Sequence, residues 1–285
     1  MVTMSVVIPA HNERTLIQRL LGDLTSGPLA ASLEIVVVPN GCTDDTAAVA
    51  ASIDPRVVVS SIAMGSKIAA LREGDRVATV FPRAYVDADV TVTPETLLAL
   101  ADALRRPGGP LVASPRLVVD SSRASWPVRQ HFRVWELTDY RRQGHIGSGI
   151  YALAESGRAR FGDWPNVIAD DRFVQQLFLP GERLTLPDHS FSVESPRTLR
   201  AQILRGARIV RGNRELPSAI QNAEPPSPAR HLALATRILS RPGLWPAAVI
   251  YTASTGATRL RARWETVRHR PADWHRDETT RTDRD

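Results

Sequence analysis

The sequence predicts an α/β fold, in which a mostly parallel sheet is flanked by helices and followed by a C-terminal helical extension. Short apolar runs alternate with helix-like segments through the first hundred residues. This alternation is typical of parallel strands joined by right-handed helical crossovers. Hydrophobic residues make up 43% and charged residues 23% of the 285 residues, which excludes wholesale disorder.

The predicted strands are short and rich in Val and Ile, and the helices between them repeat apolar side chains every three or four residues. The expected strands are Ser5–Ile8, Glu34–Val38, Val57–Val59 and Ala78–Val86, the last interrupted by Pro82. Helices are expected after Asn12, Thr43, Gly65 and Thr93. Asn, Thr and Ser side chains favour such positions because their oxygens accept hydrogen bonds from the first helical N–H groups.

The rest of the chain is less regular. A strand is expected over Leu111–Val119, and helices over Val128–Arg142, Ala169–Leu179, Thr198–Val210, His231–Leu239 and Trp245–Val267. We expect one domain over residues 1–216, a Pro-rich linker over 217–228, a basic amphipathic helical extension over 229–270 and a disordered tail over 271–285.

Positive charge is concentrated near the C-terminus. The formal net charge is +6, yet residues 197–271 carry 14 arginines and three glutamates, whereas residues 1–196 are slightly acidic. This asymmetry favours an anionic partner for the basic stretch, and the alternative is arginine on solvated helix faces. The stretch lacks an aromatic-interleaved motif, so we expect no nucleic-acid partner. Apolar residues mixed with the arginines favour an anionic membrane surface.

Several classes of protein are excluded by absent signals. A single cysteine, Cys42, excludes a disulfide framework and a cysteine-based zinc site. We find no signal peptide and no apolar run of the length that spans a membrane. We therefore expect a cytoplasmic protein, with peripheral attachment to the inner face of the membrane as a further hypothesis.

One acidic pair follows an expected strand and another opens an expected helix, and ligands of α/β sheets bind at the carboxyl ends of strands. Asp87 and Asp89 could face one hard cation such as Mg²⁺ or Mn²⁺, or could be solvated turn carboxylates. Asp170 and Asp171 could supply a general base, or could simply cap a helix. Gly147-Ser148-Gly149 allows either close approach of a ligand or a tight turn. The dinucleotide, P-loop and nucleophile-elbow glycine motifs do not occur.

Five segments, in order, resemble those of family 2 glycosyltransferases. They are Ser5-Val-Val-Ile-Pro-Ala-His-Asn-Glu13, Pro39-Asn-Gly-Cys-Thr-Asp-Asp-Thr46, Lys67-Ile-Ala-Ala-Leu-Arg-Glu-Gly74, Tyr85-Val-Asp-Ala-Asp89 and Asp170-Asp171. The resemblance covers roughly residues 3–212. It implies a GT-A type, Rossmann-like fold and transfer of a sugar from a nucleotide-diphosphate donor.

The resemblance also implies roles for individual residues. Those expected to bind the nucleotide sugar are Pro9, Ala10, Asn12, Glu13, Asn40, Lys67 and Asp87. Asp89 would ligate Mg²⁺ or Mn²⁺ most directly, with Asp87 beside it and His189 as a further candidate ligand. Such a cation stabilises the charge that develops on the leaving diphosphate.

Asp171 matches the family's catalytic base, which removes the proton of an acceptor hydroxyl in an inverting displacement. Asp170 would orient the acceptor, and Gly147, Ser148 and Gly149 match the loop that forms the floor of the acceptor pocket. The chain-building synthases of the family carry Gln-x-x-Arg-Trp, which here is replaced by a segment starting at Arg205.

That replacement favours the addition of a single sugar to a hydroxyl acceptor, with a lipid-linked acceptor as one candidate. The competing hypothesis is a catalytically degenerate protein on the same scaffold that binds a sugar nucleotide or a membrane. A third, a nucleotidyltransferase, is disfavoured because residues 9–14 lack a glycine-rich basic loop.

Overall fold

The computed structural model describes residues 1–139, 146–167, 169–214 and 228–267. The chain divides into a sheet unit, Met1–Val118 with Ile146–Val193, and a helical unit, Val119–His145 with Glu194–Asp285. Two helices that we expected in the first domain therefore group with the C-terminal extension. The predicted linker over 217–228 lies outside the described residues except for Pro228, and so does the predicted tail over 271–285.

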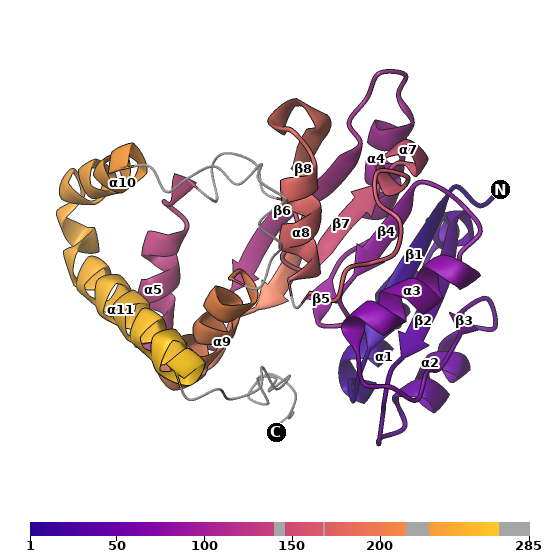
Figure 1. The fold of residues 1–285 in the computed structure, drawn as a ribbon, viewed down its shortest axis with the longest axis horizontal. Helices are drawn as coiled ribbons and strands as arrows, with labels where there is room; N and C mark the ends of the chain where they lie inside the picture. The colour runs from indigo at the N-terminus through magenta and orange to yellow at the C-terminus, as the bar shows by residue number, and fades with distance from the viewer. Residues whose placement is uncertain (140–145, 168, 215–227, 268–285) are drawn as a thin grey trace. The chain divides into compact units, whose positions relative to one another are not determined.

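The described strands of the sheet unit form one sheet in the order β3-β2-β1-β4-β7-β6-β8-β5 (Figure 1). Their bounds are β1 Met4–Ala10, β2 Leu33–Pro39, β3 Val58–Val59, β4 Arg83–Val86, β5 Val90–Thr91, β6 Val112–Asp120, β7 Ile150–Leu153 and β8 Arg183–Glu194. The pairs β1–β2, β1–β4 and β2–β3 are parallel, as predicted. The pairs β4–β7, β6–β7 and β5–β8 are antiparallel.

Helices of the sheet unit cover the strands with apolar faces. Their bounds are α1 Arg14–Leu24, α2 Thr46–Ile53, α3 Lys67–Val77, α4 Pro94–Arg105, α7 Glu155–Arg158 and α8 Asp170–Leu177, with short 3₁₀ turns at Pro28–Ser32 and Pro180–Glu182. The buried face of α1 consists of Leu16, Ile17, Leu20, Leu21 and Leu24, at the spacing that predicted it. The central strand β1 is buried along its whole length, which explains its unbroken apolar sequence.

Helix starts were predicted with mixed success. Thr93 caps α4 as expected, because its side chain accepts a hydrogen bond from the Thr96 N–H at 3.3 Å. The prediction was wrong for Asn12, which adopts a positive φ of 51° and instead accepts a hydrogen bond from the Thr43 N–H at 2.8 Å. The prediction of a helix directly after Thr43 was also wrong, because α2 begins at Thr46. These polar side chains join two strand-end loops rather than cap helices.

Two strands also differ from expectation. The strand β4 begins only at Arg83, after the proline that was expected to interrupt it. The twelve-residue β8 was not predicted, because its sequence has few β-branched residues and contains Pro187.

The helical unit consists of α5 (Trp126–Trp135), α9 (Leu199–Gly212), α10 (Pro228–Leu239) and α11 (Trp245–Val267), with a 3₁₀ turn at Pro242–Leu244. Helix α11 packs against α5 and α9. The contact with α9 is close, since a Cβ on Gly206 would lie 2.8 Å from Thr258 Cγ2. Within the described residues, no helix is long and apolar enough to cross a bilayer.

Buried His131 of α5 links the three packed helices. Its Nδ1 lies 2.7 Å from Ser254 Oγ of α11, and its Nε2 lies 3.2 Å from the Gln202 amide nitrogen of α9. Burial lowers the pKa of His131 to about 4. The imidazole is therefore neutral at neutral pH, and its two ring nitrogens connect α5 to α9 and α11 by polar contacts.

The contact between α3 and β1 depends on a glycine. A Cβ on Gly74 would lie 2.2 Å from Val7 Cγ1, and Val7 is fully buried. We predict that Gly74→Ala lowers the free energy of unfolding by about 1–3 kcal/mol, because overpacking forces the helix and strand apart. Thermal and denaturant unfolding measure the change.

The matched control is Gly22→Ala in α1, where the added Cβ has no neighbour within 4 Å. There the same substitution should raise the unfolding free energy by up to about 1 kcal/mol, since alanine is the better helix former. Equal effects at both positions would contradict the tight α3–β1 contact.

Candidate active site

A single ammonium joins two carboxylates at the carboxyl end of the sheet. Lys67, the first residue of α3, places its Nζ 2.7 Å from Asp87 Oδ1 and 2.8 Å from Asp170 Oδ1. The helix starts here because the Ser66 side chain accepts a hydrogen bond from the Ala69 N–H. Lys67 thus connects the start of α3, the loop after β4 and the start of α8.

The other acidic residues lie beside this bridge. Asp87 directly follows β4, and its N–H donates to the Gly149 carbonyl at 2.8 Å. Asp89 is exposed and directly precedes β5. Asp171 follows Asp170 in the first turn of α8. The two acidic pairs singled out in the sequence are therefore brought to one place.

The predicted acceptor loop holds the predicted base. The Ser148 N–H donates to Asp171 Oδ2 at 2.9 Å, and the Arg172 N–H donates to Asp171 Oδ1 at 2.7 Å. A Cβ on Gly147 would lie 2.5 Å from Asp171 Cβ, and Gly147 has a φ of 104°. Glycine is required at this position both for its backbone conformation and for this approach.

Burial dominates the electrostatics of the site. It raises the pKa of Asp87 to about 6; the Lys67 ammonium opposes this rise, and the carboxylates of Asp89 and Asp170 add to it. Burial likewise raises the pKa of Asp171, with a further contribution from Asp170. Burial disfavours the Lys67 charge, but Asp170 and Asp87 outweigh it and hold the pKa of Lys67 above its usual value.

One ammonium among these carboxylates leaves negative charge uncompensated, which suits a divalent cation. Asp89 is exposed, so its oxygens are accessible to an ion. His189 lies partly exposed on β8. Within the described ranges no three His, Cys, Asp or Glu side chains gather closely enough to hold a metal, so its role stays a prediction.

The predicted nucleotide residues lie where β1 and β2 end. Pro9 and Ala10 close β1, and buried Asn40 donates from its side-chain amide to the Ala10 carbonyl at 2.8 Å. The buried Glu13 side chain accepts a hydrogen bond from the His11 N–H at 3.1 Å. These contacts show how the two loops are held together; direct contact with a nucleotide stays a prediction.

Gly41 was not singled out, although it determines how closely the next loop approaches. It has a φ of 57°, and a Cβ there would lie 2.6 Å from the backbone nitrogen of Gly65. Its N–H also donates to the Ile62 carbonyl at 2.9 Å. Residues 61–66 therefore lie against the predicted nucleotide loop.

Sequence reasoning also missed Tyr151, whose hydroxyl donates to Asp170 Oδ2 at 2.8 Å. Asp170 is almost fully buried, and each of its oxygens has a partner, Lys67 on one side and Tyr151 on the other. Tyr151 follows the glycine loop in β7, directly opposite Tyr85 of β4. Only the pairing of β4 with β7 could have revealed this neighbour.

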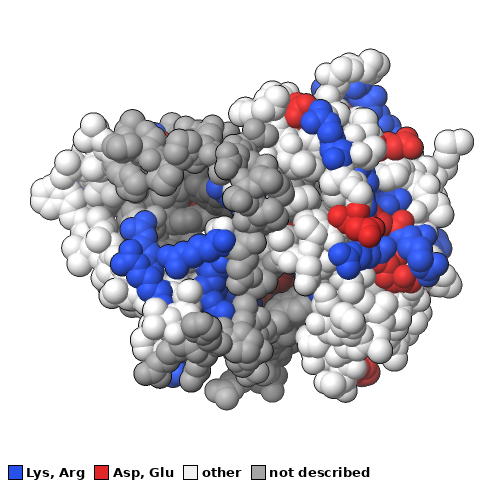
Figure 2. Space-filling model, in the orientation of Figure 1, with Lys and Arg blue, Asp and Glu red and all other residues white. Residues whose placement is uncertain are grey.

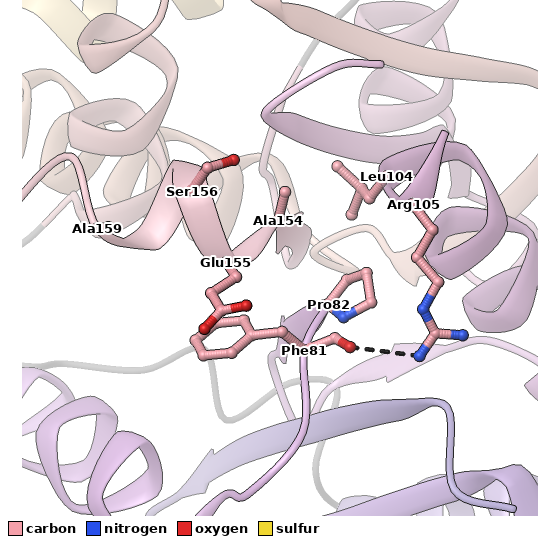
Figure 3. Close-up of a pocket in the computed structure, with 8 residues that line it drawn as sticks. All are labelled: Phe81, Pro82, Leu104, Arg105, Ala154, Glu155, Ser156 and Ala159. Carbon is pink, nitrogen blue, oxygen red and sulfur yellow. Dashed lines mark hydrogen bonds between the residues drawn. The ribbon is translucent and has the colours of Figure 1, made fainter. Parts of the chain in front are cut away.

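A separate pocket of about 450 Å³ lies beyond the opposite end of β4 (Figure 3). Its lining residues are Phe81, Pro82, Leu104, Arg105, Ala154, Glu155, Ser156 and Ala159. The Arg105 guanidinium donates to the Phe81 carbonyl there at 3.3 Å. None of the predicted site residues lines this pocket, so the carboxylate cluster remains the candidate active site.

Comparison with solved structures finds enzymes of similar fold. The mannosyltransferase PcManGT from Pyrobaculum calidifontis, solved with GDP-Man and Mn²⁺, has a TM-score of 0.59 at 22% identity over 95% of this chain and 81% of that one. Glucosyl-3-phosphoglycerate synthase from Mycobacterium tuberculosis, solved with Mn²⁺, UDP and phosphoglyceric acid, has a TM-score of 0.56 at 17% identity over 76% and 80%.

Staphylococcus aureus TarS has a TM-score of 0.52 at 16% identity, and the match covers 97% of this chain but 56% of TarS. A search of curated protein sequences found no match. The family model described as glycosyl transferase family 2 matches residues 5–161, which is more than half of the chain. The protein therefore belongs to glycosyl transferase family 2 and is a glycosyltransferase with the GT-A fold.

Proposed function

We propose that this glycosyltransferase moves one sugar from a nucleotide-diphosphate donor to a hydroxyl acceptor, with inversion and with a divalent cation. The observation that carries the proposal is the position of Asp171. Its carboxylate accepts a hydrogen bond from the Ser148 N–H of the glycine loop, and it directly follows Asp170, which pairs with Lys67. Burial raises its pKa, which makes the carboxylate a better proton acceptor than an ordinary aspartate.

The reaction assigns one proton transfer to the protein. The acceptor oxygen forms a bond to the anomeric carbon while the bond from that carbon to the diphosphate oxygen breaks. Asp171 takes the hydroxyl proton, and the nucleotide diphosphate leaves with the bond's electron pair. In-line attack in one displacement gives inversion.

We assign the cation to Asp89 and Asp87, whose hard oxygens suit Mg²⁺ or Mn²⁺. A bound cation would supply electrostatic stabilisation of the leaving diphosphate. The similar mannosyltransferase and glucosyl-3-phosphoglycerate synthase were solved with Mn²⁺ and with GDP-Man or UDP, so Mn²⁺ and these donors are the first to test. Pro9, Ala10, Asn12, Glu13 and Asn40 remain the proposed nucleotide contacts, with Lys67 towards the phosphates.

Single addition is supported by the sequence of α9. The segment from Arg205 lacks the Gln and Trp of the chain-building synthases, and an isoleucine, Ile209, stands in place of the tryptophan. A chain-building enzyme would need another means to hold its growing product.

The activity is tested with Asp171→Asn, assayed as sugar transfer to a panel of hydroxyl acceptors with Mn²⁺. We predict a fall in kcat of about 10²–10⁴-fold, because the amide cannot accept the proton. Nucleotide-diphosphate binding, measured by calorimetry, should change by less than about threefold, since Asp171 does not touch the donor's leaving group.

The control is Asp102→Asn on the exposed face of α4, which should retain wild-type kcat. An Asp171→Asn enzyme of undiminished kcat would refute the assignment of the base. A wild-type chain that binds nucleotide but turns over no donor–acceptor pair would instead favour the degenerate scaffold.

We also infer that α10 and α11 dock on an anionic bilayer. The outer face of α11 bears a stripe of exposed apolar side chains: Trp245, Val249, Leu260, Trp264 and Val267, of which Val249 and Val267 are at least 70% exposed. Helix α10 bears exposed Leu232 and Leu239. Apolar stripes that face outward on two neighbouring helices are typical of interfacial helices.

The positive charge of these helices favours an anionic bilayer over an apolar protein surface as the docking partner. Exposed Arg259 and Arg263 flank the apolar stripe of α11. The one carboxylate in residues 228–267 is Glu265, which pairs with Arg211 at 3.0 Å and with Arg261 at 2.5 Å. Figure 2 shows basic side chains gathered on the helical unit. Docking of this kind gives access to a lipid-linked hydroxyl acceptor, which is the acceptor class we propose.

Co-sedimentation with vesicles of phosphatidylcholine and phosphatidylglycerol tests this. We predict that Val249→Glu with Leu260→Glu lowers vesicle binding at least about tenfold, because two apolar side chains lose their burial in lipid. The matched control, Leu29→Glu with Val58→Glu on exposed positions of the sheet unit, should bind as wild type. Equal binding by both variants, or binding to neutral vesicles alone, would contradict docking by these helices.

A further inference from the structure

A buried carboxylate that no motif indicated is connected to the active site through aromatic side chains. Asp75 lies in α3, downstream of Lys67, and is only 11% exposed. Its Oδ1 accepts hydrogen bonds from Arg83 and from the Tyr85 hydroxyl, each at 2.6 Å. Its Oδ2 accepts from Arg158 at 2.8 Å and from the Trp164 indole at 2.7 Å.

This set of donors makes Asp75 a fixed anchor. Burial alone would raise the pKa of its carboxyl, but the Tyr85, Arg83 and Arg158 donors outweigh burial and hold that pKa below its usual value. Trp164, which is fully buried, packs edge-on against Tyr85 with ring centroids 5.0 Å apart. The Tyr85 ring is therefore fixed from both its hydroxyl and its edge.

Two stacked tyrosines connect Asp75 to the active site. Tyr85 and Tyr151 stand opposite each other on β4 and β7, with ring centroids 5.1 Å apart and an angle of 26° between the rings. Both are 2% exposed. Burial raises the pKa of Tyr151 well above that of an ordinary tyrosine, with a further contribution from Asp170, so its hydroxyl stays protonated and donates a hydrogen bond to Asp170.

Resting on the proposed function, we propose that Tyr151 is a positioning residue: its hydroxyl fixes Asp170, and through the shared Lys67 ammonium it fixes Asp87 and the adjacent base Asp171. Asp170 is poorly accessible to an acceptor, because its side chain is 3% exposed and its two oxygens already bind Lys67 and Tyr151. Its part is then to hold Lys67 and the first turn of α8, rather than to orient the acceptor.

The chain offers a matched pair of variants. Tyr151→Phe removes the hydroxyl that donates a hydrogen bond to Asp170 and keeps the stacked ring. Tyr85→Phe removes the hydroxyl of the other ring of the same stack, and that hydroxyl meets Asp75 instead. Each loses one buried hydrogen bond to a carboxylate, so a merely structural role predicts equal effects on melting temperature and on kcat.

The positioning role predicts that the two variants differ in kcat. The kcat of Tyr151→Phe should fall about 10- to 100-fold, the value expected for a lost hydrogen bond to a charged group, with donor KM within about threefold of wild type. Tyr85→Phe should keep kcat within about threefold, because Trp164 and Tyr151 still hold its ring and its hydroxyl does not contact Asp170. Equal kcat values for the two variants, or a change in donor KM alone, would overturn the proposal.

A second readout does not depend on turnover. Lys67 is the chain's only lysine, so protein labelled with ¹³Cε-lysine gives one side-chain Cε resonance. That resonance should shift in Tyr151→Phe and stay in place in Tyr85→Phe. If no donor is turned over, the proposed function fails while this comparison still decides whether Tyr151 controls the Lys67 bridge.

Folding of each variant is checked by its melting transition. Should Tyr151→Phe not fold, Asp170→Asn takes its place, since the amide keeps an acceptor for Tyr151 but loses the charge that holds Lys67. A kcat unchanged in Asp170→Asn would equally overturn the proposal.

Discussion

The active site depends on a single ammonium, that of Lys67. Lys67 stands between Asp87 and Asp170, and so ties together the start of α3, the end of β4 and the start of α8. Carboxylates at the carboxyl end of a buried sheet repel one another, and burial penalises each charge. One ammonium removes part of that cost without neutralising the cluster. The remaining negative charge is what a divalent cation and a proton-accepting Asp171 both require.

The surrounding structure keeps this arrangement in place through backbone geometry and packing. The glycine loop brings the Ser148 N–H to Asp171, and only glycine at position 147 permits that approach. On the far side of the bridge, Tyr151 connects Asp170 to a stack of aromatic rings anchored at Asp75. The chemistry is thus placed on loops, while rigid elements of the sheet set its geometry.

Features determined by short stretches of sequence were predictable. A helix from about Trp245 was predicted and α11 begins there, and the Thr93 cap of α4 was found, because helical periodicity and capping act within a few residues. The acidic pairs at residues 87–89 and 170–171 were found from their order along the chain. Long-range pairing was not predictable: β8, the antiparallel β4–β7 pair and therefore Tyr151 follow from contacts between distant segments. Asn12 failed as a cap because a tertiary partner, the Thr43 N–H, competes for its oxygen.

The most direct test of the account is the free energy of unfolding of Lys67→Met as a function of pH, compared with wild type. Removing the ammonium leaves the buried Asp170 and the partly exposed Asp87 without a counterion, so we expect a loss of about 3–5 kcal/mol at pH 7, mostly from Asp170. The folded variant would bind protons more readily than its unfolded chain, so the deficit should shrink as the pH falls towards 5. A variant as stable as wild type at pH 7, or a deficit that does not change with pH, would contradict the central role of the Lys67 bridge.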